Sequence, residues 1–217
     1  MRRFKGIGSA VLVVCAAIAA MAFGAGRFGA SPGTAAGKVG THPGGIGLMK
    51  GPLKPAAGDE LAAFSAGCFW GVEDAFRQVP GVVATAVGYT GGTVPNPTYE
   101  QVCTHTTGHA ESVLVEFDPK RISYPKLLSW FWKIHDPTQV DRQGPDIGNS
   151  YRSAIWCFSD EQLRQARASE SEQAKELKAP IATQISRAKP FYLAEDYHQQ
   201  YAERTGDHSC PVRYPGG

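Results

Sequence analysis

The spacing of apolar residues predicts that the chain alternates between strands and helices from about residue 60 onwards. Residues 61–66 form a short apolar run, which is typical of a buried strand. From Phe69 the apolar residues recur at helical spacing, so we expect a helix to follow at once. The β-branched run 82–89 and the alternating run 112–117 predict two more strands. This half of the chain therefore has the predicted order strand, helix, strand, strand.

The second half of the folded part continues with the same kinds of element. Ser123 is expected to cap a helix with one apolar stripe, and residues 153–158 predict another strand. The capping-box spacing that begins at Ser159 predicts a polar helix as far as about Leu177, and a short strand at 181–185 precedes a loop-rich tail. This order predicts an α+β fold with a ferredoxin-like split βαβ core, in which helices pack on a mixed sheet, plus a coiled C-terminal tail.

The N-terminal residues have the pattern of a targeting segment. Residues 1–30 begin with three basic side chains and continue as an apolar, Ala-rich stretch close to the roughly 20 residues that a membrane helix needs. We expect either a cleaved secretory signal peptide or an uncleaved membrane anchor, and hence export to the bacterial periplasm or another extracytoplasmic location. Residues 31–59 are rich in Gly and Pro and are interpreted as a flexible linker. The catalytic domain is then expected to span residues 60–217.

Composition and charge narrow the possible partners. The chain is 42% hydrophobic and 19% charged, which is ordinary for a globular protein. Its 22 Lys and Arg residues against 20 Asp and Glu residues give a net charge of +2, without a basic block or a basic-aromatic stripe. Nucleic-acid binding is therefore not expected. Nothing in the sequence indicates an obligate assembly, so we expect a monomer.

Cys68 lies where the first predicted strand ends and the first predicted helix begins. The unpaired N–H groups and the positive dipole end of a helix favour a thiolate, so we expect a lowered pKa and a nucleophilic sulfur. Gly67 and Gly71 allow a tight turn that leaves the sulfur uncovered. The alternative is a buried core cysteine, which is common for this residue type.

The remaining cysteines suggest different roles. Cys15 belongs to the targeting segment, and Cys157 lies in a predicted strand, where we expect it in the core. Cys210 lies in a polar tail, from which a thiol can reach a distant partner and form a reversible disulfide. No C-x-x-C motif is present, which argues against a thioredoxin-type dithiol.

Two other classes of protein are open at this point. Cys103, His105 and His109 carry zinc-ligand side chains, although zinc normally takes four ligands and the tail would have to supply another. With these side chains as ligands, the protein would be a metal-binding or redox-sensing domain. An acyl-transferring Cys–His hydrolase is the second alternative, but neither histidine can be placed beside Cys68 from the sequence.

Four polar residues are candidates to assist Cys68. Glu111 opens the third predicted strand; its usual fate would be solvent exposure, whereas burial beside a thiol would raise its pKa and let it donate a proton. Tyr99, Asp146 and Tyr151 lie in predicted loops rich in Gly, Asn and Pro, and such loops often carry active-site residues.

Several distinctive motifs occur in order between about residues 60 and 201. They are GCFWG at 67–71, GYTGG at 88–92, NPTYEQVC at 96–103, TGHAE at 107–111, HDPT at 135–138, RQGPDIG at 142–148, YRSAI at 151–155 and AEDYHQQY at 194–201. With these motifs the chain resembles the A-class peptide methionine sulfoxide reductases, which are peptide-methionine (S)-S-oxide reductases.

The resemblance implies a role for each candidate around the sulfoxide. Cys68 would attack the sulfoxide sulfur, and Glu111 would protonate the departing oxygen. Tyr99 and Tyr151 would donate hydrogen bonds to that oxygen, and Asp146 would support Glu111.

The resemblance also implies how the substrate is held and how the enzyme is recycled. Phe69 and Trp70 would form an apolar wall around the methyl group of the substrate. Cys210 would resolve the Cys68 sulfenic acid as a Cys68–Cys210 disulfide, which thioredoxin or a similar dithiol, or dithiothreitol in vitro, would reduce. The tail lacks the second recycling cysteine that many members carry, so Cys210 is expected to meet the reductant directly.

The substrates implied by the resemblance are the S epimers of methionine sulfoxide in oxidised proteins, and of the free amino acid. The implied role is repair of oxidised proteins under oxidative stress. No bound cofactor and no metal are expected, because the reducing equivalents come from external thiols.

Overall fold

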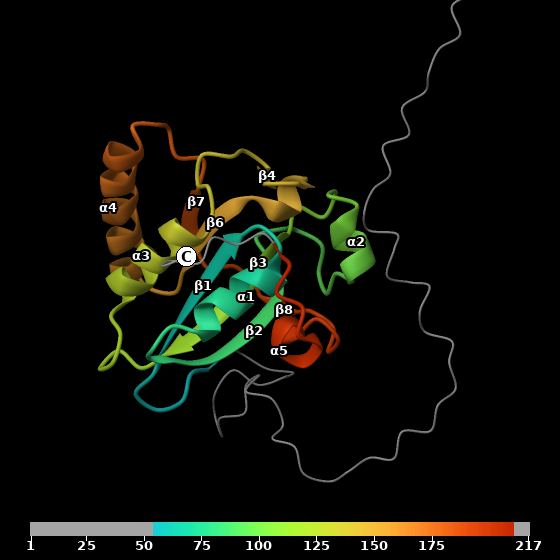
Figure 1. Cartoon of the computed structure of the whole chain (residues 1–217), viewed down its shortest axis with the longest axis horizontal. Coiled ribbons are helices and arrows are strands. Elements are labelled where there is room, and N and C mark those ends of the chain that lie inside the picture. The colour runs from blue at the N-terminus through green and yellow to red at the C-terminus, as the bar shows by residue number, and fades with distance from the viewer. Residues whose placement is uncertain (1–53, 211–217) are drawn as a thin grey trace, which may run out of the picture. The chain divides into compact units, whose positions relative to one another are not determined.

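The computed structural model describes residues 54–210 (Figure 1). The predicted targeting segment and residues 31–53 of the predicted linker lie outside the described residues, as do residues 211–217. Between residues 54 and 210, no helix combines the length and the apolar character that crossing a membrane requires.

The described elements form one large sheet, one small hairpin and the helices around them. In chain order they are β1 (Glu60–Ala66), α1 (Phe69–Arg77), β2 (Val82–Thr90), α2 (Tyr99–Cys103), β3 (Ala110–Phe117), α3 (Tyr124–Ile134), β4 (Arg142–Gln143), β5 (Asp146–Ile147), η2 (Asn149–Tyr151), β6 (Ser153–Cys157), α4 (Asp160–Leu177), β7 (Gln184–Arg187), β8 (Tyr192–Leu193) and α5 (Tyr201–Thr205). The six-stranded sheet has the order β7-β6-β1-β3-β2-β8. All its pairs are antiparallel except β6 with β7.

The four central strands confirm the predicted ferredoxin-like core. β1 and β2 run parallel with β3 between them and are joined by α1, while β3 and β6 flank β1 and are joined through α3. Two split βαβ units are therefore interleaved in one sheet. The parallel pair β6–β7 makes the sheet mixed, as predicted.

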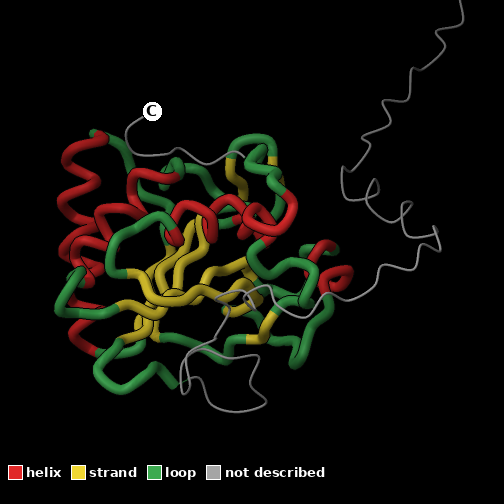
Figure 2. Tube along the Cα trace, turned by 60° about the horizontal axis from the view of Figure 1, so that its bottom comes forward, coloured by secondary structure: helices red, strands yellow, loops and turns green. Residues whose placement is uncertain are grey.

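Apolar packing holds α1, α3 and α4 against one face of this sheet (Figure 2). Phe64 of β1 is fully buried there, with its ring centroid 4.8 Å from that of Phe76 on α1 and 5.3 Å from that of Phe131 on α3. The opposite face carries a second apolar cluster that includes Leu114 and Trp156. Burial of this much apolar side-chain surface is the main force that fixes α1, and thereby the turn before it.

Three details differ from the predictions. Every residue of β3 is buried, because this central strand is covered on both faces rather than on one. Ser123 precedes α3 but makes no capping hydrogen bond with its side chain, whereas Ser159 accepts one from the backbone N–H of Gln162. The last predicted strand lies at Gln184–Arg187 rather than 181–185, where it pairs with β6. Cys157, by contrast, is buried in β6 as expected.

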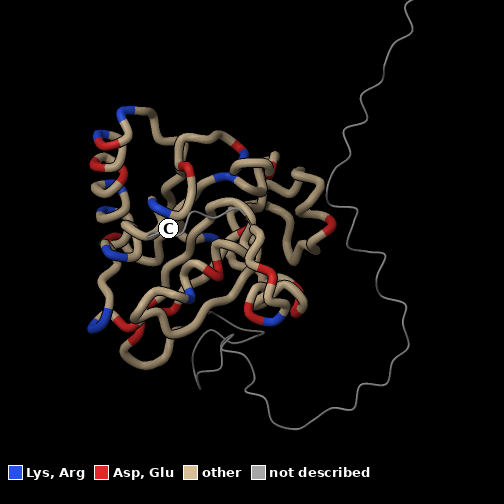
Figure 3. The backbone as a smooth tube through the Cα atoms, in the orientation of Figure 1, with Lys and Arg blue, Asp and Glu red and all other residues tan. Residues whose placement is uncertain are grey.

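Charged residues are spread over the described part rather than gathered in one place (Figure 3). They are frequent along α4, where acidic and basic side chains follow one another on the exposed side. This arrangement explains why α4 is polar over most of its length and buries little more than Gln162 and Ala166.

Candidate active site

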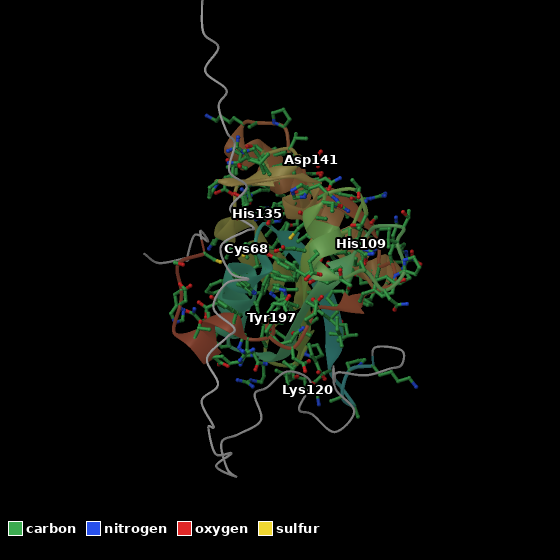
Figure 4. The ribbon with its side chains drawn as sticks, turned by 90° about the vertical axis from the view of Figure 1, so that its right-hand side faces the viewer. Cys68, His109, Lys120, His135, Asp141 and Tyr197 are labelled. Carbon is green, nitrogen blue, oxygen red and sulfur yellow. The ribbon has the colours of Figure 1, made fainter. Side chains whose placement is uncertain are left out.

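Cys68 is the N-cap residue of α1, directly after the turn that leaves β1. The turn depends on Gly67, whose φ of +99° is a conformation that favours glycine. A β-carbon at this position would lie 2.8 Å from the side chain of Gln143, so there is no room for a larger residue either. Cys68 makes no side-chain capping bond, and its sulfur is left for other partners (Figure 4).

The nearest such partner is the thiol of Cys210. The two sulfurs lie 3.2 Å apart although the residues are 142 positions apart in the chain, and both cysteines are free thiols. The structure therefore brings together the two cysteines that the sequence singled out for redox chemistry. Hydrogen bonding to Cys68 and to the backbone of Gly71 lowers the pKa of Cys210, against the effect of its partial burial.

The pKa of Cys68 is raised well above its ordinary value, which is the opposite of the prediction. The hydrogen bond with Cys210 is the largest cause, followed by burial and by the negative charge of Glu111. A backbone hydrogen bond from Trp70 lowers the pKa of Cys68, as predicted, but its effect is smaller than these three effects, which raise it. The prediction considered only the helix end, whereas the neighbours that reverse the shift come from distant parts of the chain. Cys68 is therefore protonated at neutral pH while it faces Cys210.

Glu111 lies on β3 with its carboxyl group beneath the turn that carries Cys68. It is 3% exposed, and its Oε2 accepts a hydrogen bond from the backbone N–H of Phe69 at 3.0 Å. Burial raises the pKa of Glu111 to about 8; the Phe69 N–H opposes this shift, and the charges of Asp146 and Cys210 add to it. A carboxyl group with this pKa holds its proton at neutral pH and is able to donate it.

The other polar candidates come from three different elements. Asp146 lies in β5, where burial raises its pKa. Tyr99 opens the short helix α2 instead of lying in a loop; burial and then the charge of Glu111 raise its pKa, and Tyr151 contributes too. Tyr151 ends η2 and packs edge-on against His105, with ring centroids 5.9 Å apart. Asp146 and Tyr99 therefore lie close enough to Glu111 to interact with its charge, and Tyr151 interacts with Tyr99.

Phe69 and Trp70 have different environments. Phe69 is 1% exposed and packs on Tyr89 and on His198, so it belongs to the core as well as to the site. Trp70 is only partly buried and stacks on Tyr201, with ring centroids 3.9 Å apart. Its indole N–H donates to Nδ1 of His198 at 3.1 Å. Trp70 is therefore held by the C-terminal tail, with part of its surface exposed beside Cys68.

His198 and Glu195 are site residues that the sequence reasoning did not single out. Burial lowers the pKa of His198 to about 4, and since its Nδ1 accepts from Trp70, the neutral ring carries its proton on Nε2. Glu195 accepts hydrogen bonds from the backbone N–H of Tyr99 and from the hydroxyl of Tyr89, both at 2.9 Å. The motif at 194–201 contained both residues, but only their partners in the fold explain their roles.

The residues of the alternative metal site are engaged elsewhere. His109 accepts from the backbone of Gly92 and donates to the carbonyl of Val94, and His105 bonds to Ser150. Within residues 54–210, no group of three or more His, Cys, Asp or Glu side chains is placed to hold a metal ion. The metal-binding alternative consequently has no geometric support in this part of the chain.

Paired thiols beside a buried, protonated carboxyl group and an aromatic cluster are the features of a thiol-dependent redox enzyme. A family model described as peptide methionine sulfoxide reductase matches residues 60–216. The chain therefore belongs to the peptide methionine sulfoxide reductase family, which confirms the resemblance found in its motifs.

Known members of the family are similar in sequence and in structure. A peptide methionine sulfoxide reductase MsrA from Methanosarcina mazei is 60% identical over 154 residues, which cover 70% of this chain and 73% of that protein. The structure of methionine sulfoxide reductase A of Corynebacterium diphtheriae matches with a TM-score of 0.69 and 37% identity, over 80% of this chain and 90% of that one.

A yeast relative has been solved in more than one state. Mxr1 from Saccharomyces cerevisiae in reduced form matches with a TM-score of 0.68 and 36% identity, covering 72% of this chain and 91% of that one. Its complex with Trx2 matches with a TM-score of 0.53 and 28% identity, covering 77% of this chain and 97% of that one.

Proposed function

We propose that this protein reduces the S epimer of methionine sulfoxide, in oxidised proteins and as the free amino acid, back to methionine. The observation that carries the proposal is the contact between the Cys68 and Cys210 sulfurs, together with the buried carboxyl group of Glu111 that is bonded to the backbone N–H of Phe69. The family relatives support the substrate, since the similar proteins are named for peptide methionine sulfoxide. The biological role would be repair of oxidised proteins.

In the first step Cys68 reduces the sulfoxide. The Cys68 sulfur bonds to the sulfoxide sulfur, and the sulfoxide oxygen leaves as water with the proton of Glu111 and the thiol proton of Cys68. A water molecule then bonds to the Cys68 sulfur as the bond between the two sulfurs breaks, and the proton that this water releases returns to Glu111. Methionine and a Cys68 sulfenic acid are the products, so the sulfoxide is reduced and Cys68 is oxidised. Tyr99 and Tyr151 donate hydrogen bonds to the sulfoxide oxygen, and Asp146 helps to keep the proton on Glu111.

The high pKa of Cys68 is compatible with this sequence of events. Substrate binding displaces the thiol of Cys210 from Cys68, which removes the largest cause of the upward shift. Phe69 and Trp70 then orient the methyl group so that the sulfoxide sulfur faces the Cys68 sulfur. The neutral ring of His198 fixes the indole of Trp70 for this purpose.

In the second step Cys210 resolves the sulfenic acid. A sulfur–sulfur bond forms as the Cys68 sulfur–oxygen bond breaks, and the hydroxyl group leaves as water with the thiol proton of Cys210. The Cys68–Cys210 disulfide is then reduced by thioredoxin or a similar dithiol. A thioredoxin partner is supported by the yeast relative that was solved in complex with Trx2.

The location of this reaction is a separate part of the proposal. The basic and then apolar sequence of residues 1–30 is the reason to place the protein outside the cytoplasm, with or without a retained membrane anchor. We also propose that it acts as a monomer. Cell fractionation tests the first point, because recovery of the full-length chain from the cytoplasm contradicts export, and analytical ultracentrifugation tests the second.

The activity is tested with a peptide that contains methionine S-sulfoxide. Wild type, Cys68→Ser and Cys210→Ser are compared with dithiothreitol and then with thioredoxin as reductant. We expect Cys68→Ser to be inactive with both reductants, because the nucleophile is gone. Cys210→Ser should stay active with dithiothreitol, which reduces the sulfenic acid directly, and should lose turnover with thioredoxin.

A matched control is Cys157→Ala, which removes a buried thiol of β6 and should leave both activities unchanged. Peptides with the R epimer should not be reduced. A folded, fully reduced wild type without activity contradicts the proposed function, and equal reduction of both epimers contradicts its stereochemical part. Turnover by Cys210→Ser with thioredoxin would mean that another group resolves the sulfenic acid.

A further inference from the structure

The tail that carries Cys210 is attached to α1 at several points. The carboxylate of Glu73 accepts a hydrogen bond from the backbone N–H of Gln200 at 2.7 Å, and Arg77 pairs with Glu203 of α5 at 2.7 Å. α5 then ends at Gly206, whose φ of +72° turns the chain. Residues 206–210 lead from this turn to the N-terminal end of α1, where Cys68 lies.

A side-chain pair joins this last segment to the middle of α1. His208 Nδ1 lies 2.8 Å from Asp74 Oδ2, and since a carboxylate can only accept, the imidazole Nδ1 carries the proton. Asp74 is largely buried, with a side chain 9% exposed, whereas the His208 side chain is 57% exposed. The mechanism assigned above uses neither residue.

The position of the pair suggests what it does. Asp74 is on the helix whose first turn carries Cys68, and His208 is two residues before Cys210. Asp207 stiffens the same segment, because its carboxylate accepts a hydrogen bond from the backbone N–H of Ser209 at 3.0 Å. The pair thus fixes the tail to the same rigid element that holds the nucleophile.

We propose that the Asp74–His208 pair positions the Cys210 sulfur for its attack on the Cys68 sulfenic acid. The proposal rests on the proposed function, in which Cys210 is the resolving cysteine. The step that it assists joins the two sulfurs, breaks the Cys68 sulfur–oxygen bond and releases water that contains the Cys210 thiol proton. Asp74 and His208 are positioning residues, and neither exchanges a proton with the reacting atoms.

Holding the tail in place matters because the two cysteines belong to distant parts of the chain. A tail without a fixed path would bring the Cys210 sulfur to Cys68 only in a small fraction of its conformations. The contact between the Gly71 backbone and the Cys210 sulfur adds a second attachment at the helix end. Loss of the Asp74–His208 pair should therefore slow disulfide formation without slowing the first step.

The test separates the two steps in a single turnover without reductant. Wild type, Asp74→Ala, His208→Ala and the double variant are mixed with a methionine S-sulfoxide peptide. The methionine formed in the first turnover reports the reductase step. Formation of the sulfenic acid consumes one free thiol, so the loss of a second free thiol per molecule reports the disulfide. Dimedone added during the reaction traps the sulfenic acid that has not yet been resolved.

We expect an unchanged rate of methionine formation, disulfide formation slowed roughly fivefold, the scale of one side-chain hydrogen bond, and more dimedone adduct. The double variant should be no slower than either single variant, because both remove the same contact. Glu203→Ala is the matched control. It breaks another contact between α1 and the tail, one that lies before the turn at Gly206, and this variant should form the disulfide at the wild-type rate.

The possible failures can be told apart. If wild type forms no methionine, the proposed function is overturned, and this inference with it. If methionine forms normally and both variants make the disulfide at the wild-type rate, the inference alone is overturned. Additive effects of the two substitutions also overturn it, because they would show that Asp74 and His208 act independently. His208→Ala keeps the test valid if Asp74→Ala does not fold.

Discussion

The carboxylate of Glu111 accepts a hydrogen bond from the backbone N–H of Phe69, at 3.0 Å, and Phe69 is the residue directly after Cys68. Strand β3 thereby holds the acid against the first turn of α1, which presents the thiol. One carboxyl oxygen is occupied by this bond, so the proton that Glu111 retains is carried by the other one. A hydrogen bond from the backbone thus fixes the Glu111 side chain relative to the nucleophile.

Replacing Glu111 by Gln should remove most of the reductase activity. The amide keeps an oxygen for the Phe69 N–H but has no acidic proton for the sulfoxide oxygen. We expect the first turnover to slow by about 10²–10⁴-fold, the usual contribution of a general acid. Glu116→Gln is a matched control, since Glu116 is buried in the same strand but faces the other side of the sheet and bonds to Ala56. Wild-type rates in Glu111→Gln would rule out the acid role.

The first step should also slow as the pH rises through about 8. Burial raises the pKa of Glu111 to about 8, so the proton needed by the sulfoxide is present below that pH and lost above it. We expect the single-turnover rate of methionine formation to be level near pH 7 and to fall above pH 8. A profile measured from pH 6 to 10, with thiol state monitored, provides the check. If Glu111→Gln shows the same fall in rate above pH 8, the titrating group is not Glu111.

Gly67→Ala should destabilise the fold and disturb the site together. The positive φ disfavours any residue with a β-carbon, and this β-carbon would meet Gln143 at 2.8 Å. We expect a loss of roughly 1–3 kcal/mol in the free energy of unfolding, measured with denaturant. Gly144→Ala is the control, because Gly144 also has a positive φ, of +57°, but has nothing within 4 Å of the added β-carbon. Equal losses in both variants would mean that the contact with Gln143 is unimportant.

The long elements could be predicted from the sequence, and the short ones could not. Apolar spacing predicted α1 and the central strands because burial against neighbours repeats along each of them. Helix α2 and the two-residue strands β4, β5 and β8 have no such period. α2 is held by a capping box at Thr98 and by the Glu195 carboxylate on its first N–H, and that second contact comes from far along the chain. Tyr99 was for this reason expected in a loop.

The place of Cys68 in the fold was easier to predict than the direction of its pKa shift. Cys68 was correctly predicted at the turn between β1 and α1, because Gly67 and the change in apolar spacing indicate that turn in the sequence. The direction of its pKa shift was wrong, because the sulfur of Cys210 and the charge of Glu111 reach it through the fold. His198 was missed for a similar reason. Its ring packs on Phe69, Trp70 and Tyr99, which belong to two other segments of the chain.

Glu73 should make the stability of the protein depend on pH. It is 1% exposed, and burial raises its pKa to about 7, against hydrogen bonds from Thr85 and from the Gln200 backbone. Between pH 4.5 and about 7 the native state keeps this proton and the unfolded chain releases it, so the stabilisation is present at low pH and is lost as the pH rises. The size of the shift corresponds to about 3 kcal/mol over this window.

Glu73→Gln removes this titration and keeps an acceptor for the Gln200 N–H. The free energy of unfolding of Glu73→Gln relative to wild type should therefore increase between pH 5 and pH 8, by up to about 3 kcal/mol. Denaturant titrations at both pH values measure the difference, and the raised pKa of Glu111 cancels because both proteins contain that residue. A difference that does not change with pH would mean that Glu73 is ionised in the native state throughout, with its carboxylate stabilised by Thr85, Gln200 and the nearby Arg77.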